Sequence, residues 1–313
     1  MSNLIFSLNA TMPVFLLMVL GYGLHRLGLF DDVFAAKANA FVFRVALPAK
    51  LFADMAGANL SELWDTRFVV YCFAVSAASV ALGLLLSRLC RDRLIRGEFT
   101  QVTYRSSSAI MGIAYMQNIY GSSGMTPLMI AASVPLYNVA AVVLLTLTGP
   151  AAAGRKPDIK KTLIDIAKNP IILGILAGLL WSLTGITMPS IPEKLISNVG
   201  SMASPLGLMS MGAMFTFSAM LREAKPVLAA SFLKLIGFAA LFLPIAVWMG
   251  FTGSALVSIL ILLASPATIS SFIMAKNMGH DGTVTSGTVM LTTLLSALTM
   301  TGWLFLLKSF GLI

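Results

Sequence analysis

Apolar stretches of about 20 residues recur along almost the whole chain, and each is long enough to cross a bilayer as a helix. The chain is 58% hydrophobic and only 11% charged, which excludes a soluble protein with an ordinary polar surface. We therefore expect an all-α integral membrane protein that keeps its uncharged N-terminal stretch as a first span. The stretches are residues 4–24, 33–57, 68–87, 125–148, 170–187, 195–219, 227–250, 255–275 and 283–307.

Charge, rather than hydropathy, predicts a further crossing at residues 98–121. Only residues 109–116 of this segment are mostly apolar, so hydropathy alone would assign a loop. Basic clusters lie before this segment and after the next span, and both can be cytoplasmic only if an even number of crossings separates them. The sequence thus predicts about ten spans with both termini outside, and it explains the net charge of +9 as cytoplasmic-loop bias rather than as a nucleic-acid surface. The clusters are Arg88, Arg91, Arg93 and Arg96, then Arg155, Lys156, Lys160, Lys161 and Lys168.

Internal similarity indicates that the chain consists of two halves, residues 1–152 and 153–313. Apolar matches are common in this composition, but several proline and glycine matches at one offset of 157 residues are not. Since each half would hold an odd number of spans, the second half would enter the membrane upside down relative to the first. The matches are Pro13 and Pro170, Gly21 and Gly178, Gly28 and Gly185, Ala46 and Ala203, Pro48 and Pro205, Leu51 and Leu208, and Ser108 and Ser265, followed one residue out of step by Gly121 and Gly279 and by Gly124 and Gly282.

The stretch LLASPATISSFIMA, residues 262–275, interrupts an apolar span with a proline among hydroxyl residues. Pro266 frees a carbonyl group, which is tolerated at membrane depth only beside a polar cavity or buried protein. Proline kinks and hydroxyls bonded to the preceding turn are also common packing features, and the stretch alone favours that interpretation. Its repeat partner Ser108 lies in RSSSAIMG, however, which belongs to the most polar crossing of the first half. Two polar breaks related by a repeat indicate the solute site of a carrier that alternates between two orientations.

Seven motifs follow one another along the chain: MPVFLLMVLGYGLHRLGLF at 12–30, FVFRVALPAKLF at 41–52, SSAIMGIAYMQNIYG at 107–121, KNPIILGILAGLL at 168–180, ASPLGLMSMG at 203–212, FLKLIGF at 232–238 and ASPATISSFIMAKNMG at 264–279. In this order they resemble the auxin efflux carrier family of membrane transporters. That family includes plant auxin exporters and bacterial carriers assigned to malonate and similar organic acids.

The resemblance implies ten helices in two inverted five-helix halves, similar to the sodium and bile-acid symporters. The first two helices of each half, within residues 4–57 and 170–219, would form a scaffold. The other three, within 68–148 and 227–307, would form a transport domain that moves like an elevator between the two sides of the membrane. A homodimer formed through the scaffold helices stays open.

The family's fourth and ninth helices are broken and cross each other, and the resemblance assigns these roles to residues 98–121 and 255–275. Two positions depart from the family pattern. Ser107 stands where the family usually has asparagine, and Ala114 stands where it often has proline. A hydroxyl therefore replaces an amide that would contact the solute, so the family's substrates do not transfer directly. Gly112 would supply the flexibility that the missing proline provides.

Basic residues inside the predicted spans indicate the charge of the solute. Arg44, Lys50, Arg105 and Lys234 lie in segments that otherwise need to be apolar to cross the membrane, where a central cation costs about 2.5 to 3.5 kcal/mol. Snorkelling, or for Lys50 an ion pair with Asp54 one turn later, explains some of them. Acidic residues are confined to loops and span ends, so we do not expect sodium–proton exchange. A positive interior with half-helix N-termini at the breaks suits a small organic anion, a mono- or dicarboxylate.

The candidate substrate-binding residues surround the two breaks, where hydroxyls and an amide can donate hydrogen bonds to an anion. Arg105 and Lys234 are the candidate anion-attracting residues. The substrate-binding candidates are Ser106, Ser107, Ser108, Gly112, Asn138, Ser265, Pro266, Thr268, Ser270 and Ser271, with Thr285 or Ser286 as secondary candidates.

Two other transport functions stay open. One is a sodium-coupled symporter for another substrate class, because hydroxyls and freed carbonyls can bind sodium without a carboxylate. The other is an anion channel, which the lack of a repeated ring-forming filter motif disfavours. An enzyme is not expected, because the hydroxyls have no nearby base to activate them. We expect no metal site, cofactor or nucleic-acid partner, and we expect a multi-pass protein of the inner (plasma) membrane in contact with lipid.

Overall fold

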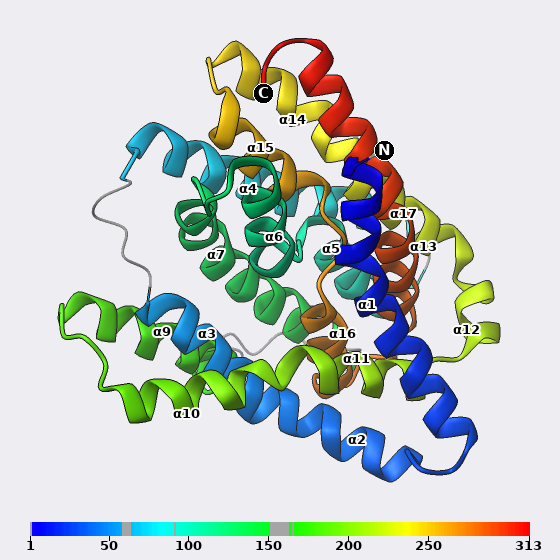
Figure 1. Cartoon of the computed structure of the whole chain (residues 1–313). Helices are drawn as coiled ribbons and strands as arrows, with labels where there is room; N and C mark the ends of the chain where they lie inside the picture. Colours follow the sequence, from blue (N-terminus) through cyan, green and yellow to red (C-terminus); the bar gives the residue numbers. More distant parts are fainter. Residues whose placement is uncertain (1, 58–63, 91, 151–162, 165) are drawn as a thin grey trace.

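The computed structural model describes residues 2–57, 64–90, 92–150, 163–164 and 166–313, and this part of the chain is helical (Figure 1). The helices of the first half are α1 (Ser2–Arg26), α2 (Asp32–Phe41), the π turn η1 (Val42–Ala46), α3 (Leu47–Ala56), α4 (Thr66–Ser87), α5 (Leu94–Tyr104), α6 (Ser108–Tyr120) and α7 (Thr126–Thr148). Those that follow are α9 (Pro170–Leu183), α10 (Ser190–Ser201), α11 (Ala203–Ala213), α12 (Phe217–Arg222), α13 (Ala224–Phe232), the π turn η3 (Leu233–Gly237), α14 (Phe238–Trp248), α15 (Gly253–Ala264), α16 (Ile269–Asn277) and α17 (Thr283–Ser309).

Within the described residues, four helical runs are long and apolar enough to cross a bilayer, judged by length and composition: α4, α7, the continuous run from α13 through η3 to α14, and α17. The prediction of an all-helical membrane protein is confirmed for the described residues. The ten crossings and the inverted halves stay predictions. The predicted boundary between the halves, at residues 152 and 153, lies outside the described residues.

Several of the other predicted spans consist of shorter helices in succession. The span predicted at 33–57 contains α2, η1 and α3, and the span at 195–219 contains α11 and part of α10. The polar segment 98–121 forms two helices rather than a loop, α5 and α6, and residues 255–275 form α15 and most of α16. Every residue of α5 from Gly97 to Tyr104 is buried, as is every residue of α15 from Leu256 to Ala264. Both helix breaks therefore follow segments that other helices enclose.

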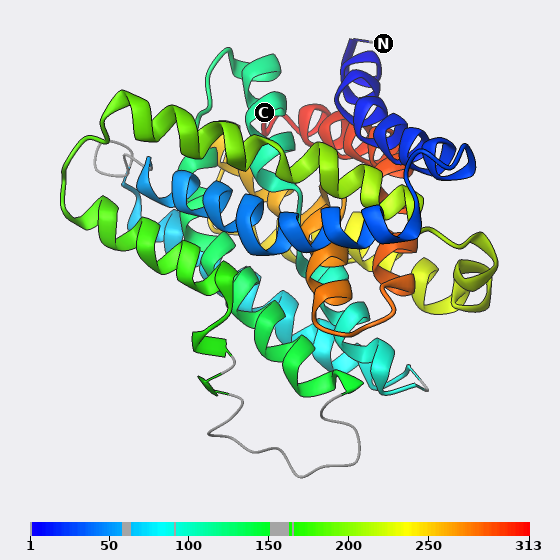
Figure 2. The ribbon, with the colours of Figure 1, turned by 90° about the horizontal axis from the view of Figure 1, so that it is seen from below.

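The helices assigned to the predicted scaffold pack on one another. Helix α3 lies against α9 and α10, and α11 lies against α1 and α2. Figure 2 shows the continuous run from α2 to α3 beside the run from α10 to α11, and α9 packs against α3. Glycines permit this close approach, since a Cβ at Gly21 would lie 2.1 Å from Met209 O and one at Gly178 would lie 2.6 Å from Phe52 O. Gly21 and Gly178 are repeat partners, so matched glycines allow close helix contact in both halves.

Other matched glycines share a backbone conformation that side-chain-bearing residues rarely adopt. Three matched pairs, one at the offset of 157 residues and two at 158, have a positive φ angle in both members and lie at helix ends or in turns. The matched glycines thus have the same kind of backbone conformation in both halves. The φ angles are +73° at Gly28 and +66° at Gly185, +69° at Gly121 and +86° at Gly279, and +48° at Gly124 and +75° at Gly282.

Candidate functional site

The two helix breaks lie where the sequence predicts them, and they cross. One separates α5 from α6, and the other separates α15 from α16. The backbones of Ser106 and Ala267 form an isolated antiparallel bridge. The Ser107 N–H donates a hydrogen bond to Pro266 O at 2.9 Å. The crossing thus joins residues from opposite halves of the chain.

Groups of the protein replace the helical hydrogen bonds that are lost at the second break. In a continuous helix the N–H of residue 266 would donate to Leu262 O, but Pro266 has no N–H. Leu262 O instead accepts a hydrogen bond from Ser106 Oγ. The Ala267 N–H donates to Thr292 Oγ1 on α17 at 3.1 Å. A buried break is tolerated because its polar backbone atoms find these partners.

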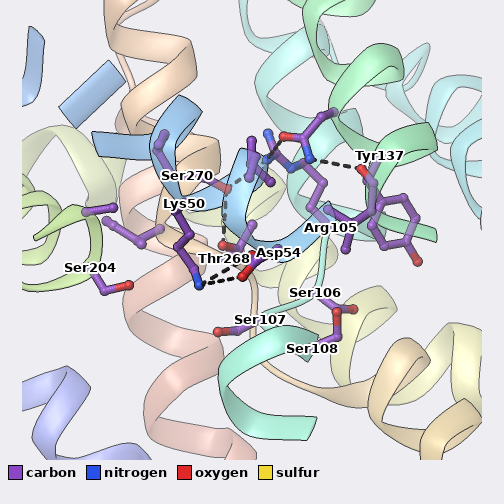
Figure 3. A pocket seen from close by; sticks show the side chains of 16 residues that line it. Lys50, Asp54, Arg105, Ser106, Ser107, Ser108, Tyr137, Ser204, Thr268 and Ser270 are labelled. Atoms are coloured by element: carbon purple, nitrogen blue, oxygen red, sulfur yellow. Dashed lines mark hydrogen bonds and ion pairs between the residues drawn. The ribbon is translucent and has the colours of Figure 1, made fainter. Parts of the chain in front are cut away.

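An open cavity lies at the crossing, and Figure 3 shows its side chains. Helices α3 and α11 of the predicted scaffold form one side, and α7 with the two breaks of the predicted transport domain forms the other. The lining residues are Leu47, Lys50, Leu51, Asp54, Arg105, Ser106, Ser107, Ser108, Val134, Tyr137, Asn138, Ala203, Ser204, Thr268, Ile269 and Ser270.

Arg105 places a cation in the wall of the cavity without a carboxylate partner. Its side chain is 3% exposed, and its guanidinium donates to Asn138 Oδ1 at 2.9 Å and to Ser270 Oγ at 2.7 Å. Nη1 donates two more hydrogen bonds, to Gln101 Oε1 one turn earlier on α5 at 3.3 Å and to Met274 Sδ on α16 at 2.7 Å. No ion pair of Arg105 occurs among the residues that the structure describes. Neutral dipoles therefore orient the guanidinium while its charge stays uncompensated.

Lys50 and Asp54 also line the cavity, and the sequence did not assign them to the site. Their side chains lie one turn apart on α3 and form an ion pair with a 3.4 Å separation between Nζ and Oδ2. The prediction that Asp54 pairs with Lys50 is confirmed, and Figure 3 shows the pair facing the breaks. With Arg105, the charged side chains of the lining leave one net positive charge. The sequence indicated that this pair lies in a polar environment, because two opposite charges spaced by one turn in an apolar span require one.

The N-terminal ends of α6 and α16 both open on the cavity. Ser107 and Thr268 immediately precede the two helices, and Ser108, Ile269 and Ser270 belong to their first turns. A helix N-terminus carries backbone N–H groups without helical partners and the equivalent of about half a positive charge. The ends of these two helices therefore add to the positive potential of the charged side chains.

Half of the predicted site residues line this cavity, and the other half lie outside its lining. Gly112 packs inside the protein, where a Cβ would lie 2.8 Å from Thr126 Cγ2. The carbonyl of Ser271 accepts from Gln101 Nε2 at 3.0 Å, and its side chain is buried. The predicted residues in the lining are Arg105, Ser106, Ser107, Ser108, Asn138, Thr268 and Ser270, and those outside it are Gly112, Lys234, Ser265, Pro266 and Ser271, together with Thr285 and Ser286.

Ser265 lies outside the lining. Its match to Ser108 failed because the offset of 157 residues does not align the two breaks. Ser108 begins α6, whereas Ser265 follows the end of α15. By position in the broken helices Ser265 corresponds to Arg105, which follows the end of α5. The Ser265 side chain is fully buried and its hydroxyl has no hydrogen-bond partner within the described chain.

Apolar helices that surround a positively charged cavity at two crossed breaks define the class as membrane transport proteins. A family model described as "Membrane transport protein" matches residues 6–304. The chain belongs to this family, the auxin efflux carrier family, as its motifs predict.

Three relatives illustrate how far the similarity extends. A "Putative malonate transporter" of Rhizobium meliloti is 27% identical over 95% of each chain. An "Uncharacterized transporter" of Methanothermobacter thermautotrophicus is 23% identical over 95% of this chain and 97% of the relative. The "Uncharacterized transporter YfdV" of Escherichia coli K12 is 25% identical over 60% of this chain and 62% of the relative.

Proposed function

We propose that this protein is a secondary transporter of a small organic anion, a mono- or dicarboxylate, and that the anion binds in the cavity at the crossed breaks. The observation that carries the proposal is the uncompensated guanidinium of Arg105 in a cavity onto which two helix N-termini open. Serine and threonine hydroxyls beside it can donate hydrogen bonds to carboxylate oxygens. The name of the Rhizobium meliloti relative, "Putative malonate transporter", supports the same substrate class.

The position of the cavity supports transport by alternating access. Its walls come from the predicted scaffold on one side and from the predicted transport domain on the other. An elevator-like movement of α4 to α7 and α13 to α17 along the scaffold would carry the bound anion across the inner membrane. Both termini would lie outside, and the outer faces of the scaffold helices would be available to a second copy of the chain.

Thermal unfolding of the purified protein in detergent tests the substrate class without an assumption about direction. Mono- and dicarboxylates that bind the folded protein should raise its midpoint in a saturable way, whereas neutral analogues and amines should not. Proteoliposome uptake of the best stabiliser then measures Km. Stabilisation by cations or sugars, with none by carboxylates, would contradict the proposal.

A matched pair of serine substitutions tests the site. Ser107→Ala removes a hydroxyl from the lining and should raise Km about two- to tenfold, the effect of losing one neutral hydrogen bond. Ser265→Ala removes a buried hydroxyl behind the cavity and should leave Km unchanged. Arg105→Gln should raise Km about 10- to 100-fold, because a charged hydrogen-bond donor is lost. Equal Km values for all three variants and the wild type would place the anion elsewhere.

The reconstituted protein also distinguishes the two alternatives. A carrier gives saturable exchange and no unitary currents, whereas an anion channel gives single-channel currents in planar bilayers. A sodium-coupled symporter of another substrate class would show saturable, sodium-dependent uptake of a solute other than a carboxylate.

A further inference from the structure

Lys234 has a full set of partners at the crossing, and all of them are neutral oxygen atoms. It lies in the π turn η3 between α13 and α14, and its side chain is fully buried. The ammonium donates to Ser106 Oγ at 2.5 Å, to Leu263 O at 2.9 Å and to Leu262 O at 3.4 Å. An ammonium has three N–H donors, so these three acceptors use its whole capacity. Lys234 has no hydrogen-bond donor left for a solute.

The two carbonyl groups belong to the backbone that the second break exposes. A continuous helix would pair Leu262 O with the N–H of residue 266 and Leu263 O with that of Ala267. Residue 266 is proline, and the Ala267 N–H donates to Thr292 instead. Both carbonyls therefore have no helical partner at the C-terminal end of α15, where the helix dipole adds about half a negative charge.

This oxygen set is of the kind that binds a dissolved monovalent cation. In transporters with broken helices, unwound backbone carbonyls and half-helix C-terminal ends coordinate sodium. Two carbonyls at the C-terminal end of α15 and a serine hydroxyl provide such a set here. No ion pair of Lys234 occurs in the part of the chain that the structure describes. The ammonium thus occupies the position that a free cation would take.

We propose that Lys234 is a tethered cation that permanently fills a monovalent-cation site formed by Leu262 O, Leu263 O and Ser106 Oγ. The crossed breaks are then held together without dissolved sodium or potassium. Lys234 is a positioning residue for the crossing, whereas Arg105 is the cation available to the transported anion. The consequence for transport rests on the proposed function: uptake by the wild type should not require sodium at this site.

The test replaces Lys234 with side chains that leave or fill the space of its ammonium. Lys234→Ala removes the cation and leaves the oxygen atoms open to an ion. Lys234→Met removes the charge but fills most of the volume with an unbranched apolar chain. Each protein is purified in sodium chloride and exchanged into sodium, potassium or N-methylglucamine chloride at constant ionic strength, and its thermal unfolding midpoint is measured.

We expect the wild-type midpoint to be the same in all three salts. The Lys234→Ala midpoint should be several degrees lower in N-methylglucamine and should rise saturably with sodium or potassium, because only the folded state binds the ion. The Lys234→Met midpoint should be low and independent of the cation. A Lys234→Ala midpoint that does not respond to either ion, or a Lys234→Met midpoint that responds equally, would overturn the proposal.

Two further readouts keep the test decisive. If Lys234→Ala yields no folded protein, the wild type still tests whether the cation site is filled. Saturable stabilisation of the wild type by sodium would contradict a filled site. A sodium requirement for wild-type uptake would also contradict it. In proteoliposomes, sodium should restore uptake to Lys234→Ala but not to Lys234→Met. The thermal measurement needs no substrate. It therefore tests the cation site even if the protein transports no carboxylate and the proposed function fails.

Discussion

Glu98 provides a quantitative test of how the interior is held together, since it is a buried carboxylate that caps a long helix. It lies one turn inside α5 and is 1% exposed. Its Oε1 accepts from the Gly282 N–H at 2.8 Å, and its Oε2 accepts from the Thr285 N–H at 3.1 Å. These donors are at the N-terminal end of α17, where the helix itself offers no partners.

Glu98→Ala would leave two buried N–H groups without a partner, at a cost of about 1 to 3 kcal/mol each. The Thr285 hydroxyl would stay satisfied, because it also donates to Gly282 O at 2.9 Å. Removing the carboxylate also removes its desolvation cost, which offsets part of the loss. We therefore expect the free energy of unfolding to fall by about 3 kcal/mol. Glu98→Gln keeps one acceptor oxygen and should lose about half of that amount.

Equilibrium unfolding in mixed micelles measures the change in free energy, and hydrogen exchange at the amides of Gly282 and Thr285 shows where it arises. Asp92→Ala is the control, because Asp92 Oδ1 accepts from the Leu94 N–H in an exposed position and should cost only about 1 kcal/mol or less. The reasoning is refuted if Glu98→Ala unfolds within about 0.5 kcal/mol of the wild type and both amides keep their protection.

Three more predictions concern packing, topology and charge. Gly21→Ala should destabilise the protein strongly, because its Cβ would meet the backbone of α11. Gly23→Ala in the same helix is the control: a Cβ there would have nothing within 4 Å, so the change should be neutral or slightly stabilising. Thermal unfolding midpoints compare the two variants. Burial raises the pKa of the Cys90 thiol above its ordinary value, so maleimide labelling should be slow near neutral pH and accelerate as the pH rises and thiolate forms. A membrane-impermeant maleimide should reach it only from the cytoplasmic side, and labelling from outside would reverse the predicted topology. Asp54→Asn should lower Km for the transported anion and Lys50→Gln should raise it, because the two substitutions change the net charge of the lining in opposite directions. Uptake kinetics measure both values. A change of Km in the same direction in both variants would exclude an electrostatic role.

The sequence predicted the two breaks because their chemistry is local. Pro266 cannot continue a hydrogen-bonded helix, and charge parity required a crossing where hydropathy indicated a loop. Hydropathy alone indicates a loop where the structure has α5, because polar residues between Gly97 and Tyr104 are covered by the rest of the protein. Polar residues such as Gln101 can therefore be accommodated there by hydrogen bonds to neighbouring helices.

The parts that the sequence did not predict depend on tertiary packing. Lys50 and Asp54 line the cavity because α3, packed against α9 and α10, turns that side toward the breaks, and no local pattern specifies this rotation. Ser265 was matched to Ser108 by an offset fixed by prolines and glycines elsewhere, but the two halves differ in length around their breaks. Lys234 was grouped with Arg105 by charge alone, although its partners come from backbone atoms that the sequence does not reveal.

The π turn that carries Lys234 accommodates one residue more than an α-helical turn would. Loss of a single residue between Leu233 and Gly237 would restore regular helix and rotate the side chains on one side of the deletion by about 100° relative to those on the other. The hydropathy profile would hardly change, yet the ammonium would no longer point at its oxygen atoms. If Lys234 fills a cation site as proposed, a one-residue deletion, rather than a substitution, would make the crossing depend on the salt around it.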